Sequence, residues 1–572
     1  MPTIDIEYGE FETLLGLKLG RDIARVNEIL EFVKGEVKLF DDATGVMSVE
    51  IKDTSRPDLW NVEGLTRALR GFLGLEVGLR EYSAGKPLVE VYVDERLRGI
   101  RPLIGCAIIQ DLRLTGAMIR GFMHMQDKLD QSYGRNRQRT SIGLYDFDLL
   151  VSPLQYTVAK PGEVRFVPLG FEEEMSLDEI LDRHPKGLEY GHIVKKHPVF
   201  PILLDADKKV LSFPPVINSN DLGRITDKTE NVLVEVTGND DEAVLNTVRI
   251  VTMSLVDRGG KAYGAFIHYP KQSMAVVTPG FRPTSMDLHV EYVNRISGLE
   301  LTAKRIAGLL PKAGLGVLRK SSDTVSVQVP SYRVDVMHEV DLIEDVTIAY
   351  GYNRIRPVWR KLPTSGGARP ERAWVDTARE VMVGVGFEEV FTYTLTNPEN
   401  LFTKMNLKRE RIVEIAEPKV QTLTCLRNWL LPSLVEFLAC NVSVEYPQRI
   451  FALDVVTLLD ETQETRTRDE YWLAVATAHA SAGFTEVKSD LNAFLLNLGL
   501  ECQIRENAHP SFVKGRVGNV IVEGKRVGVL GEIHPKVLVA WGLENPVAAF
   551  ELNFQKIIAM KQKRIRACRV AK

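Results

Sequence analysis

The residues best suited to chemistry are four carboxylates, Asp335, Asp341, Glu344 and Asp345, in the stretch 331–352. The last three have the i, i+3 and i+4 spacing of one helical face, and Asp335 comes just before that helix begins. Carboxylate oxygens are the ligands that Mg²⁺ prefers, so the four are chemically suited to hold one such ion. A solvated acidic helix face has the same spacing and is the commoner case, so spacing alone favours that alternative.

A second cluster is basic and surrounds Tyr133 and Gly134. Its members are Lys128, Arg135, Arg137 and Arg139. Arginine forks onto phosphate groups and tyrosine stacks on bases, so the cluster predicts weak RNA contact. A solvated turn between a helix and a strand explains the same residues.

A third set is polar and lies in the stretch 211–238. Its members are Ser212, Asn218, Glu235 and Thr237. Their side chains have the chemistry to hold a substrate group or a water molecule. No histidine is placed for an evident Ser–His–Asp triad, so hydrolysis here would rely on a positioned water. Ordinary turn chemistry is the simpler explanation of these residues by composition alone.

Both helical and strand-like periodicities are present, which indicates an α+β multidomain protein. Helices are expected at 14–32, 62–73, 241–255, 301–310, 339–349, 372–385, 430–440 and 487–498. Strands are expected at 47–51, 89–93, 104–109, 231–236, 325–329, 389–395, 519–522, 526–530 and 548–552. The prolines of 211–220 predict a loop or an irregular strand there.

Length and composition limit the number of domains and the kinds of partner. A chain of 572 residues is expected to form three to five domains. We divide it into an N-terminal α/β domain (1–83), a domain with a mixed sheet (84–271), a small α/β domain carrying the acidic helix (272–357) and a C-terminal module (358–572). The net charge of −4 excludes a polycation, so nucleic-acid contact would need local basic patches.

Several classes of protein are disfavoured. The N-terminus lacks a signal peptide, and no apolar run reaches the length of a spanning helix, so we expect a cytoplasmic chain without a membrane partner. The five cysteines form no CxxC pair, which disfavours zinc or disulfide frameworks. No Walker A, HExxH or GxSxG motif is present.

The order of these signals along the chain resembles the β subunits of phenylalanyl-tRNA synthetases of the archaeal and eukaryotic type. The likeness rests on DTSRPDLWNVEG, on GRNRQRTSIGLYDFD and VEVTG, on YRVDVMHEVDLIEDVTIAYGYNRIRP, and on AHPSFVKGR with VGVLGEIHPKVL. It covers nearly the whole chain, and the third of these matches is the most specific. Bacterial members carry two further domains for which this length has no room.

The resemblance implies two sites. It assigns the acidic quartet to a Mg²⁺ site shared with the α subunit, although Asp345 stands where the family often has glutamate. It assigns Leu203, Ser212, Glu235 and Thr237 to a pocket in 84–271 that edits mischarged tRNA, with Glu235 orienting water or the substrate amine. Hydrolysis of Tyr-tRNA(Phe) is then the expected editing reaction, because tyrosine differs from phenylalanine by one hydroxyl group.

The resemblance also implies partners. The C-terminal module would be a noncatalytic copy of the antiparallel class II synthetase fold, since Arg427 is present but a complete ATP site is not. No residue of this chain is then catalytic for synthesis. The α subunit would supply ATP and phenylalanine chemistry in an (αβ)₂ heterotetramer that charges tRNA(Phe).

Two alternatives stay open. The chain could be a freestanding RNA-binding or scaffold protein derived from such a subunit, which sizing with and without the α subunit would reveal. A metal-dependent nuclease using the acidic quartet is disfavoured, because the carboxylates sit around one short helix and no catalytic base is evident nearby.

Overall fold

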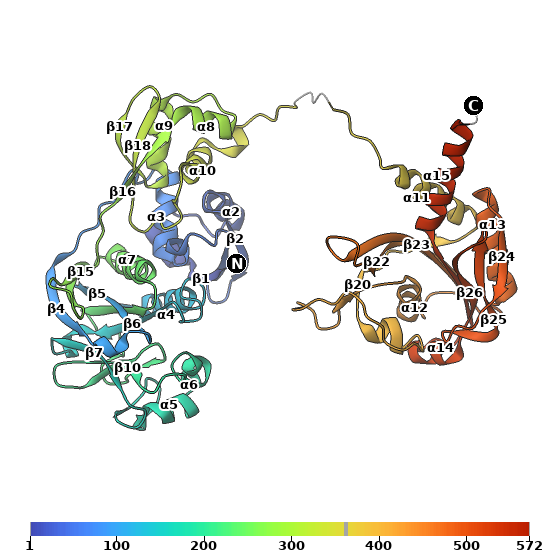
Figure 1. Ribbon diagram of the computed structural model, residues 1–572. Helices are drawn as coiled ribbons and strands as arrows, with labels where there is room; N and C mark the ends of the chain where they lie inside the picture. Colours follow the sequence, from blue (N-terminus) through green and yellow to red (C-terminus); the bar gives the residue numbers. More distant parts are fainter. Residues whose placement is uncertain (1, 360–363, 571–572) are drawn as a thin grey trace. The chain divides into compact units, whose positions relative to one another are not determined.

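The computed structural model describes residues 2–359 and 364–570, with side chains described up to residue 563. The chain divides into two compact units, Met1–Trp359 (unit 1) and Arg360–Lys572 (unit 2), drawn in Figure 1. Both units mix helices with sheets, so the α+β class predicted from the sequence is confirmed.

Unit 1 begins with a three-stranded antiparallel sheet in the order β1-β3-β2. Its strands are β1 (Thr3–Glu7), β2 (Gly35–Asp41) and β3 (Val46–Ile51), and its helices are α1 (Tyr8–Leu15), α2 (Ile23–Leu30) and α3 (Val62–Phe72). The single helical stretch expected at 14–32 is wrong, because Gly16 ends α1 in the left-handed conformation with φ of 77°. Helix α3 ends as predicted, just before Gly74.

A large mixed sheet forms the middle of unit 1, in the order β12-β11-β10-β7-β4-β14-β5-β13-β6, with β15 paired to β14. Its strands are β4 (Gly85–Val93), β5 (Leu103–Gln110), β6 (Thr140–Asp146), β7 (Leu154–Ala159), β10 (Phe200–Leu204), β11 (Val210–Phe213), β12 (Ile217–Asn218), β13 (Val232–Gly238), β14 (Lys261–His268) and β15 (Val276–Thr278). Only the β14–β4 and β4–β7 pairs are parallel. Strand β6 stands last in the strand order and is therefore an edge strand of the sheet.

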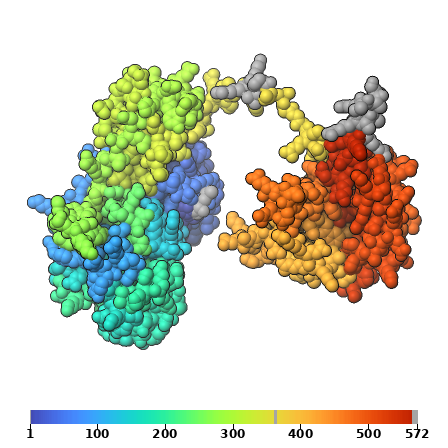
Figure 2. All heavy atoms as spheres, in the orientation of Figure 1, coloured from blue at the N-terminus to red at the C-terminus, as the bar shows by residue number. Residues whose placement is uncertain are grey.

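Helices pack against this sheet through apolar side chains, which alternate along a strand between its two faces. On β13, Val232, Val234 and Val236 pack into a cluster with residues of α4 (Gly116–Gln131) and α7 (Asp241–Asp257). The intervening Leu233 packs in a separate cluster on the other side. Two short helices, α5 (Leu177–Arg183) and α6 (Pro185–Tyr190), lie at one end of unit 1, the teal region of Figures 1 and 2.

The third sheet of unit 1 has the order β16-β18-β17 and packs with three helices. The elements are β16 (Thr284–His289), α8 (Val290–Ser297), α9 (Ala303–Leu309), β17 (Gly316–Lys320), β18 (Thr324–Val329) and α10 (Glu339–Tyr350). One hydrophobic cluster runs through residues of the three sheets described above, including Val49, Val234 and Val327. Unit 1 is thus one packed body, and its division into 1–83, 84–271 and 272–357 stays a prediction.

Unit 2 is built on a seven-stranded sheet in the order β19-β22-β23-β27-β26-β25-β24. Its strands are β19 (Glu388–Glu389), β22 (Gln448–Leu459), β23 (Thr467–Ala478), β24 (Cys502–Glu506), β25 (Phe512–Val522), β26 (Lys525–Ile533) and β27 (Val547–Asn553). All pairs are antiparallel except β19–β22. Two hydrophobic clusters involve its helices, which are α11 (Pro370–Gly384), α12 (Leu431–Cys440), α13 (Phe484–Asn497), α14 (Pro535–Trp541) and α15 (Phe554–Val570).

One strand predicted in unit 2 is corrected by the structure. The strand expected at 389–395 is wrong, because only its ends pair, in β19 and in β20 (Leu395–Thr396) with β21 (Cys425–Leu426).

Cys106, Cys425, Cys440 and Cys502 are free thiols, two of them buried. No helix in the described part of the chain combines the length and apolar character that a membrane crossing needs.

Candidate functional site

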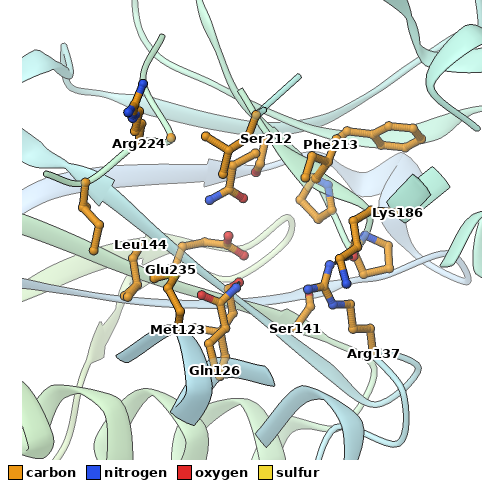
Figure 3. Close-up of a pocket in the computed structure, with 18 of the residues that line it drawn as sticks. Met123, Gln126, Arg137, Ser141, Leu144, Lys186, Ser212, Phe213, Arg224 and Glu235 are labelled. Atoms are coloured by element: carbon orange, nitrogen blue, oxygen red, sulfur yellow. Dashed lines mark hydrogen bonds between the residues drawn. The ribbon is translucent and has the colours of Figure 1, made fainter. Parts of the chain in front are cut away.

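A cavity of about 250 Å³ lies beside the edge strand β6 of the large sheet. Its apolar wall includes Met123, Leu144 and Phe213. Polar groups also line it, and they are Gln126, Asp127, Arg137, Ser141, Lys186, Ser212, Asn218, Arg224 and Glu235. Figure 3 shows the carboxylate of Glu235 directed into the cavity, with Lys186 and Arg224 on opposite sides of it. A mostly apolar cavity with a few converging polar groups is the usual form of a ligand site.

Strand pairing places Glu235 at this cavity. Glu235 pairs with Gly143 of β6 and with Cys106 of β5. A Cβ at Gly143 would lie 2.2 Å from the Tyr145 hydroxyl oxygen and 2.6 Å from Glu235 Oε2. The absence of a side chain at residue 143 therefore leaves the space that these two polar groups occupy.

Glu235 is nearly fully buried, with 3% of its surface exposed. The Tyr145 hydroxyl donates a hydrogen bond of 2.8 Å to its Oε2, whereas Oε1 is buried with no partner in the described structure. Burial raises the pKa of Glu235 to about 7, although the Tyr145 hydrogen bond and the charge of Arg101 act to lower it. A carboxyl group in this state exchanges protons near neutral pH.

Ser212 and Asn218 face each other across the β11–β12 pair. The turn between these strands carries a cis bond at Pro214–Pro215, and both prolines line the cavity. Ser212 is 2% exposed, and its hydroxyl oxygen has no hydrogen-bond partner among the described residues. Two buried polar atoms without partners in the described structure, Ser212 Oγ and Glu235 Oε1, thus belong to residues that line the same cavity, which favours a polar ligand group there.

The other two residues assigned to the pocket lie behind the cavity lining, on β10 and β13. Leu203 is fully buried, pairs with Ser212 across β10–β11 and packs in the hydrophobic cluster under the sheet. Thr237 is also fully buried, and its hydroxyl oxygen accepts a 2.9 Å hydrogen bond from Arg101 Nε. Among the described residues that line the cavity, neither Leu203 nor Thr237 appears.

The basic cluster is split by the fold. Arg137 is buried: its Nε lies 2.9 Å from Asp130 Oδ2, and its Nη1 donates to the carbonyl oxygens of Pro215 and Val216. It therefore supports the cavity wall instead of lying on the surface. Lys128, Arg135 and Arg139 line a separate open groove, where Arg139 contacts the Tyr133 ring and Asp240.

The four carboxylates already have partners within unit 1. Asp335 and Asp345 both pair with Arg333, at 2.7 and 2.8 Å. Asp341 accepts from the backbone N–H groups of Met337 and His338, and Glu344 pairs with Lys34 at 2.6 Å. Within the described residues, no three His, Cys, Asp or Glu side chains are grouped to hold a metal ion. The arrangement does not fit one ion on this chain alone, so the Mg²⁺ site stays a prediction.

Sequence reasoning missed several residues of the site, among them Gly143 and Tyr145. Gly143 and Tyr145 lie in the motif SIGLYD, but the letters alone do not show that β6 pairs with β13. The basic neighbours of Arg137 predict contact with RNA, but in the structure Arg137 is buried and pairs with Asp130. The available signal was a tyrosine two residues after a glycine in a β-like stretch, which places both on one face of a strand.

Comparisons with known proteins now bear on this site. A family model described as "tRNA synthetase B5 domain" matches residues 286–352, and one described as "Phenylalanyl tRNA synthetase beta chain CLM domain" matches residues 355–554. The chain is 42% identical over 554 residues to the phenylalanine–tRNA ligase beta subunit of Pyrococcus furiosus, covering 96% of this chain and 99% of the relative. The chain belongs to the phenylalanine–tRNA ligase β-subunit family.

Further relatives extend this result. The beta subunit of Methanothrix thermoacetophila is 35% identical over 563 residues, covering 97% of this chain and 99% of that relative. A solved N-terminal fragment of the phenylalanyl-tRNA synthetase beta subunit of Pyrococcus horikoshii is similar with a TM-score of 0.59 and 37% identity. It covers 61% of this chain and 100% of the fragment. The chain is thus a β subunit of an aminoacyl-tRNA synthetase, and the family resemblance predicted from the sequence is confirmed.

Proposed function

We propose that the cavity beside β6 hydrolyses tyrosine wrongly attached to tRNA(Phe). The observation that carries this proposal is a pair of buried polar atoms without partners in the described structure, Glu235 Oε1 and Ser212 Oγ, on residues that line one cavity. The volume of about 250 Å³ lies below the roughly 300–1,000 Å³ of pockets for drug-sized ligands. It therefore suits a single amino-acid side chain at the end of a longer substrate.

In the reaction the oxygen of a water molecule bonds to the ester carbonyl carbon, the bond from that carbon to the ribose oxygen of the tRNA breaks, and the ribose oxygen takes up a proton as tyrosine leaves. Glu235 is placed to accept a proton from that water through its free oxygen, because its pKa of about 7 keeps part of it ionised at neutral pH. The Ser212 hydroxyl is placed to hold a polar group of the substrate. Thr237 lies in the layer behind the carboxylate, where it binds Arg101, and its hydroxyl also acts to lower the pKa of Glu235.

We place attachment of phenylalanine on a separate α subunit, in an (αβ)₂ heterotetramer that uses ATP and tRNA(Phe). In this proposal unit 2 is a noncatalytic copy of the class II synthetase fold. Its nearly antiparallel sheet supports this, as does Arg427, which is fully buried and donates to Asp454 and Thr392. An arginine committed in this way is not available to bind ATP.

The remaining assignments follow from this role. We place the β subunit in the cytoplasm, and we assign Lys128, Arg135 and Arg139 to weak contact with tRNA, because they share one open groove. The Mg²⁺ site of Asp335, Asp341, Glu344 and Asp345 is expected only at a junction with the α subunit, and no step of the hydrolysis passes through it.

The test of editing is accumulation of Tyr-tRNA(Phe) by the complex of the two subunits. Glu235→Gln keeps the size of the side chain but cannot take a proton from water, so Tyr-tRNA(Phe) should accumulate. The matched control is Glu551→Gln in unit 2, another buried glutamate whose pKa burial raises to about 7. Equal, low accumulation in wild type and in both variants would refute the assignment.

The test of the subunit role is co-expression. Phenylalanine attachment should need both chains, and the β subunit should copurify with the α subunit. Full activity of the α subunit alone, with a β subunit that elutes separately, would instead favour a freestanding RNA-binding or scaffold protein.

A further inference from the structure

Tyr145 contacts the one carboxylate that the proposed hydrolysis uses. It lies on the edge strand β6, is fully buried, and donates its 2.8 Å hydrogen bond to Oε2 of Glu235. The same hydroxyl oxygen lies 3.5 Å from Asn218 Oδ1, at the limit of hydrogen bonding. Tyr145 therefore touches the carboxylate from the side opposite its free oxygen, Oε1.

The two strands fix this contact. Tyr145 follows Gly143 by two residues, so both lie on the face of β6 that Glu235 occupies on β13. A Cβ at Gly143 would overlap both the Tyr145 hydroxyl and Glu235 Oε2. The pair thus lies directly over the glycine, and the packing leaves the carboxylate little freedom to rotate.

We propose that Tyr145 is the positioning residue of the hydrolytic site: its hydroxyl holds Oε2 of Glu235 so that Oε1 alone faces the substrate and the attacking water. The inference rests on the proposed editing function and adds a residue to it. A hydrogen bond donated to a carboxylate favours the ionised form, which is the form that accepts a proton.

Tyr145 remains a donor throughout the working range, because burial and the nearby Glu235 raise its pKa well above the ordinary value. Burial acts on Glu235 in the opposite sense to the hydrogen bond, since it disfavours the ionised carboxylate. The titratable and charged groups around Glu235 come from several elements. They are Tyr145 and Cys106 on the paired strands, Tyr156, Arg101 and Asp130 nearby, and Asp127, Arg137, Lys186 and Arg224 around the cavity.

The test is the pH dependence of Tyr-tRNA(Phe) hydrolysis by the complex of the two subunits carrying Tyr145→Phe. Loss of a hydrogen bond to a charged group is expected to move the apparent pKa of the reaction upward by about one to two pH units. Near neutral pH, kcat should fall about tenfold or more while KM changes little, because Tyr145 touches the carboxylate and does not line the cavity. The rate should recover at higher pH.

Tyr269→Phe is the matched control, since it removes the hydroxyl of a half-buried tyrosine just after β14 that donates to the Ile104 carbonyl oxygen and not to Glu235. A second variant, Gly143→Ala, should also lower kcat by displacing both partners while both side chains remain. If Tyr145→Phe hydrolyses with an unchanged pH profile, the positioning role is wrong and editing stands. If wild type itself fails to hydrolyse Tyr-tRNA(Phe), the proposed function is overturned and this inference with it.

Discussion

Arg333 and Asp345 form a buried ion pair in unit 1, with 2.8 Å between Nη2 and Oδ2 and side chains that are 2% and 5% exposed. Arg333 also pairs with Asp335, whose pKa burial acts to raise but the guanidiniums of Arg333 and Arg56 lower to about 2. Arg56, which precedes α3, also pairs with Asp335. These ion pairs form a network that joins the N-terminal region to α10. Asp335 and Asp345 therefore already share one guanidinium, and Glu344 pairs with Lys34.

The first prediction concerns stability. Arg333→Met leaves Asp335 and Asp345 buried without their main partner, and such a loss costs about 3–5 kcal/mol. Chemical denaturation of unit 1 should show this as a clear shift of the unfolding midpoint. Arg305→Met, an exposed arginine on α9, is the control and should change the free energy of unfolding by less than about 0.5 kcal/mol. A shift no larger than in the control would show that the network does not stabilise the unit.

The second prediction concerns pH and stability. The folded-state pKa of Glu235 is raised from 4.5 to about 7, so its contribution to stability is fully present below about 4.5 and is lost as pH rises through 7. Glu235→Gln does not titrate. The free energy of unfolding of the variant, relative to wild type, should therefore increase between pH 4.5 and 7 by at most about 1.4 kcal/mol per pH unit, and then level off. A flat difference across that range would mean that folding does not raise the pKa of Glu235.

The third prediction concerns the cavity mouth. Lys186 and Arg224 lie on opposite sides of the cavity, and Arg224 is exposed. If they bind phosphates of the tRNA end, each neutralising substitution should raise KM for hydrolysis and lower the slope of log K against log salt by about 0.7 per contact. Lys196→Ala, an exposed lysine outside the cavity lining, should leave both unchanged. A salt slope that stays at the wild-type value in Lys186→Ala and Arg224→Ala would exclude phosphate contact.

The fourth prediction concerns unit 2. Arg427 Nη2 lies 2.6 Å from Asp454, and its other nitrogens donate to Thr392, Val455 and Tyr393. Arg427→Ala should destabilise unit 2 by about 3–5 kcal/mol, because it leaves several polar groups unpaired. It should leave ATP affinity of the two-subunit complex unchanged. Arg411→Ala, an 81% exposed arginine, serves as the stability control. Weaker ATP binding by a folded Arg427→Ala complex would contradict the noncatalytic assignment.

Much of the fold could be predicted from hydrophobic periodicity. The helices α7, α10 and α12 and the strands β5 and β13 all lie where their apolar spacing indicates. The failures have local causes. Gly16 breaks the helical stretch at 14–32 in the left-handed conformation, and the 389–395 stretch finds ladder partners only at its ends.

The candidate site was harder to predict from the sequence than the fold, because it depends on pairing between strands that are distant in the sequence. Ser212, Asn218 and Glu235 were predicted and line one cavity, whereas Tyr145 joins them only because β6 pairs with β13 across 90 residues. Arg137 is buried because it pairs with the buried Asp130, and a count of basic residues does not reveal such a partner.

Release of tyrosine from preformed Tyr-tRNA(Phe), followed in a single turnover, tests the central account most directly. The wild-type two-subunit complex should release tyrosine at least about a hundredfold faster than the Glu235→Gln complex, as expected for loss of a positioned general base. Equal rates in the two complexes would contradict the claim that the cavity beside β6 carries out this hydrolysis.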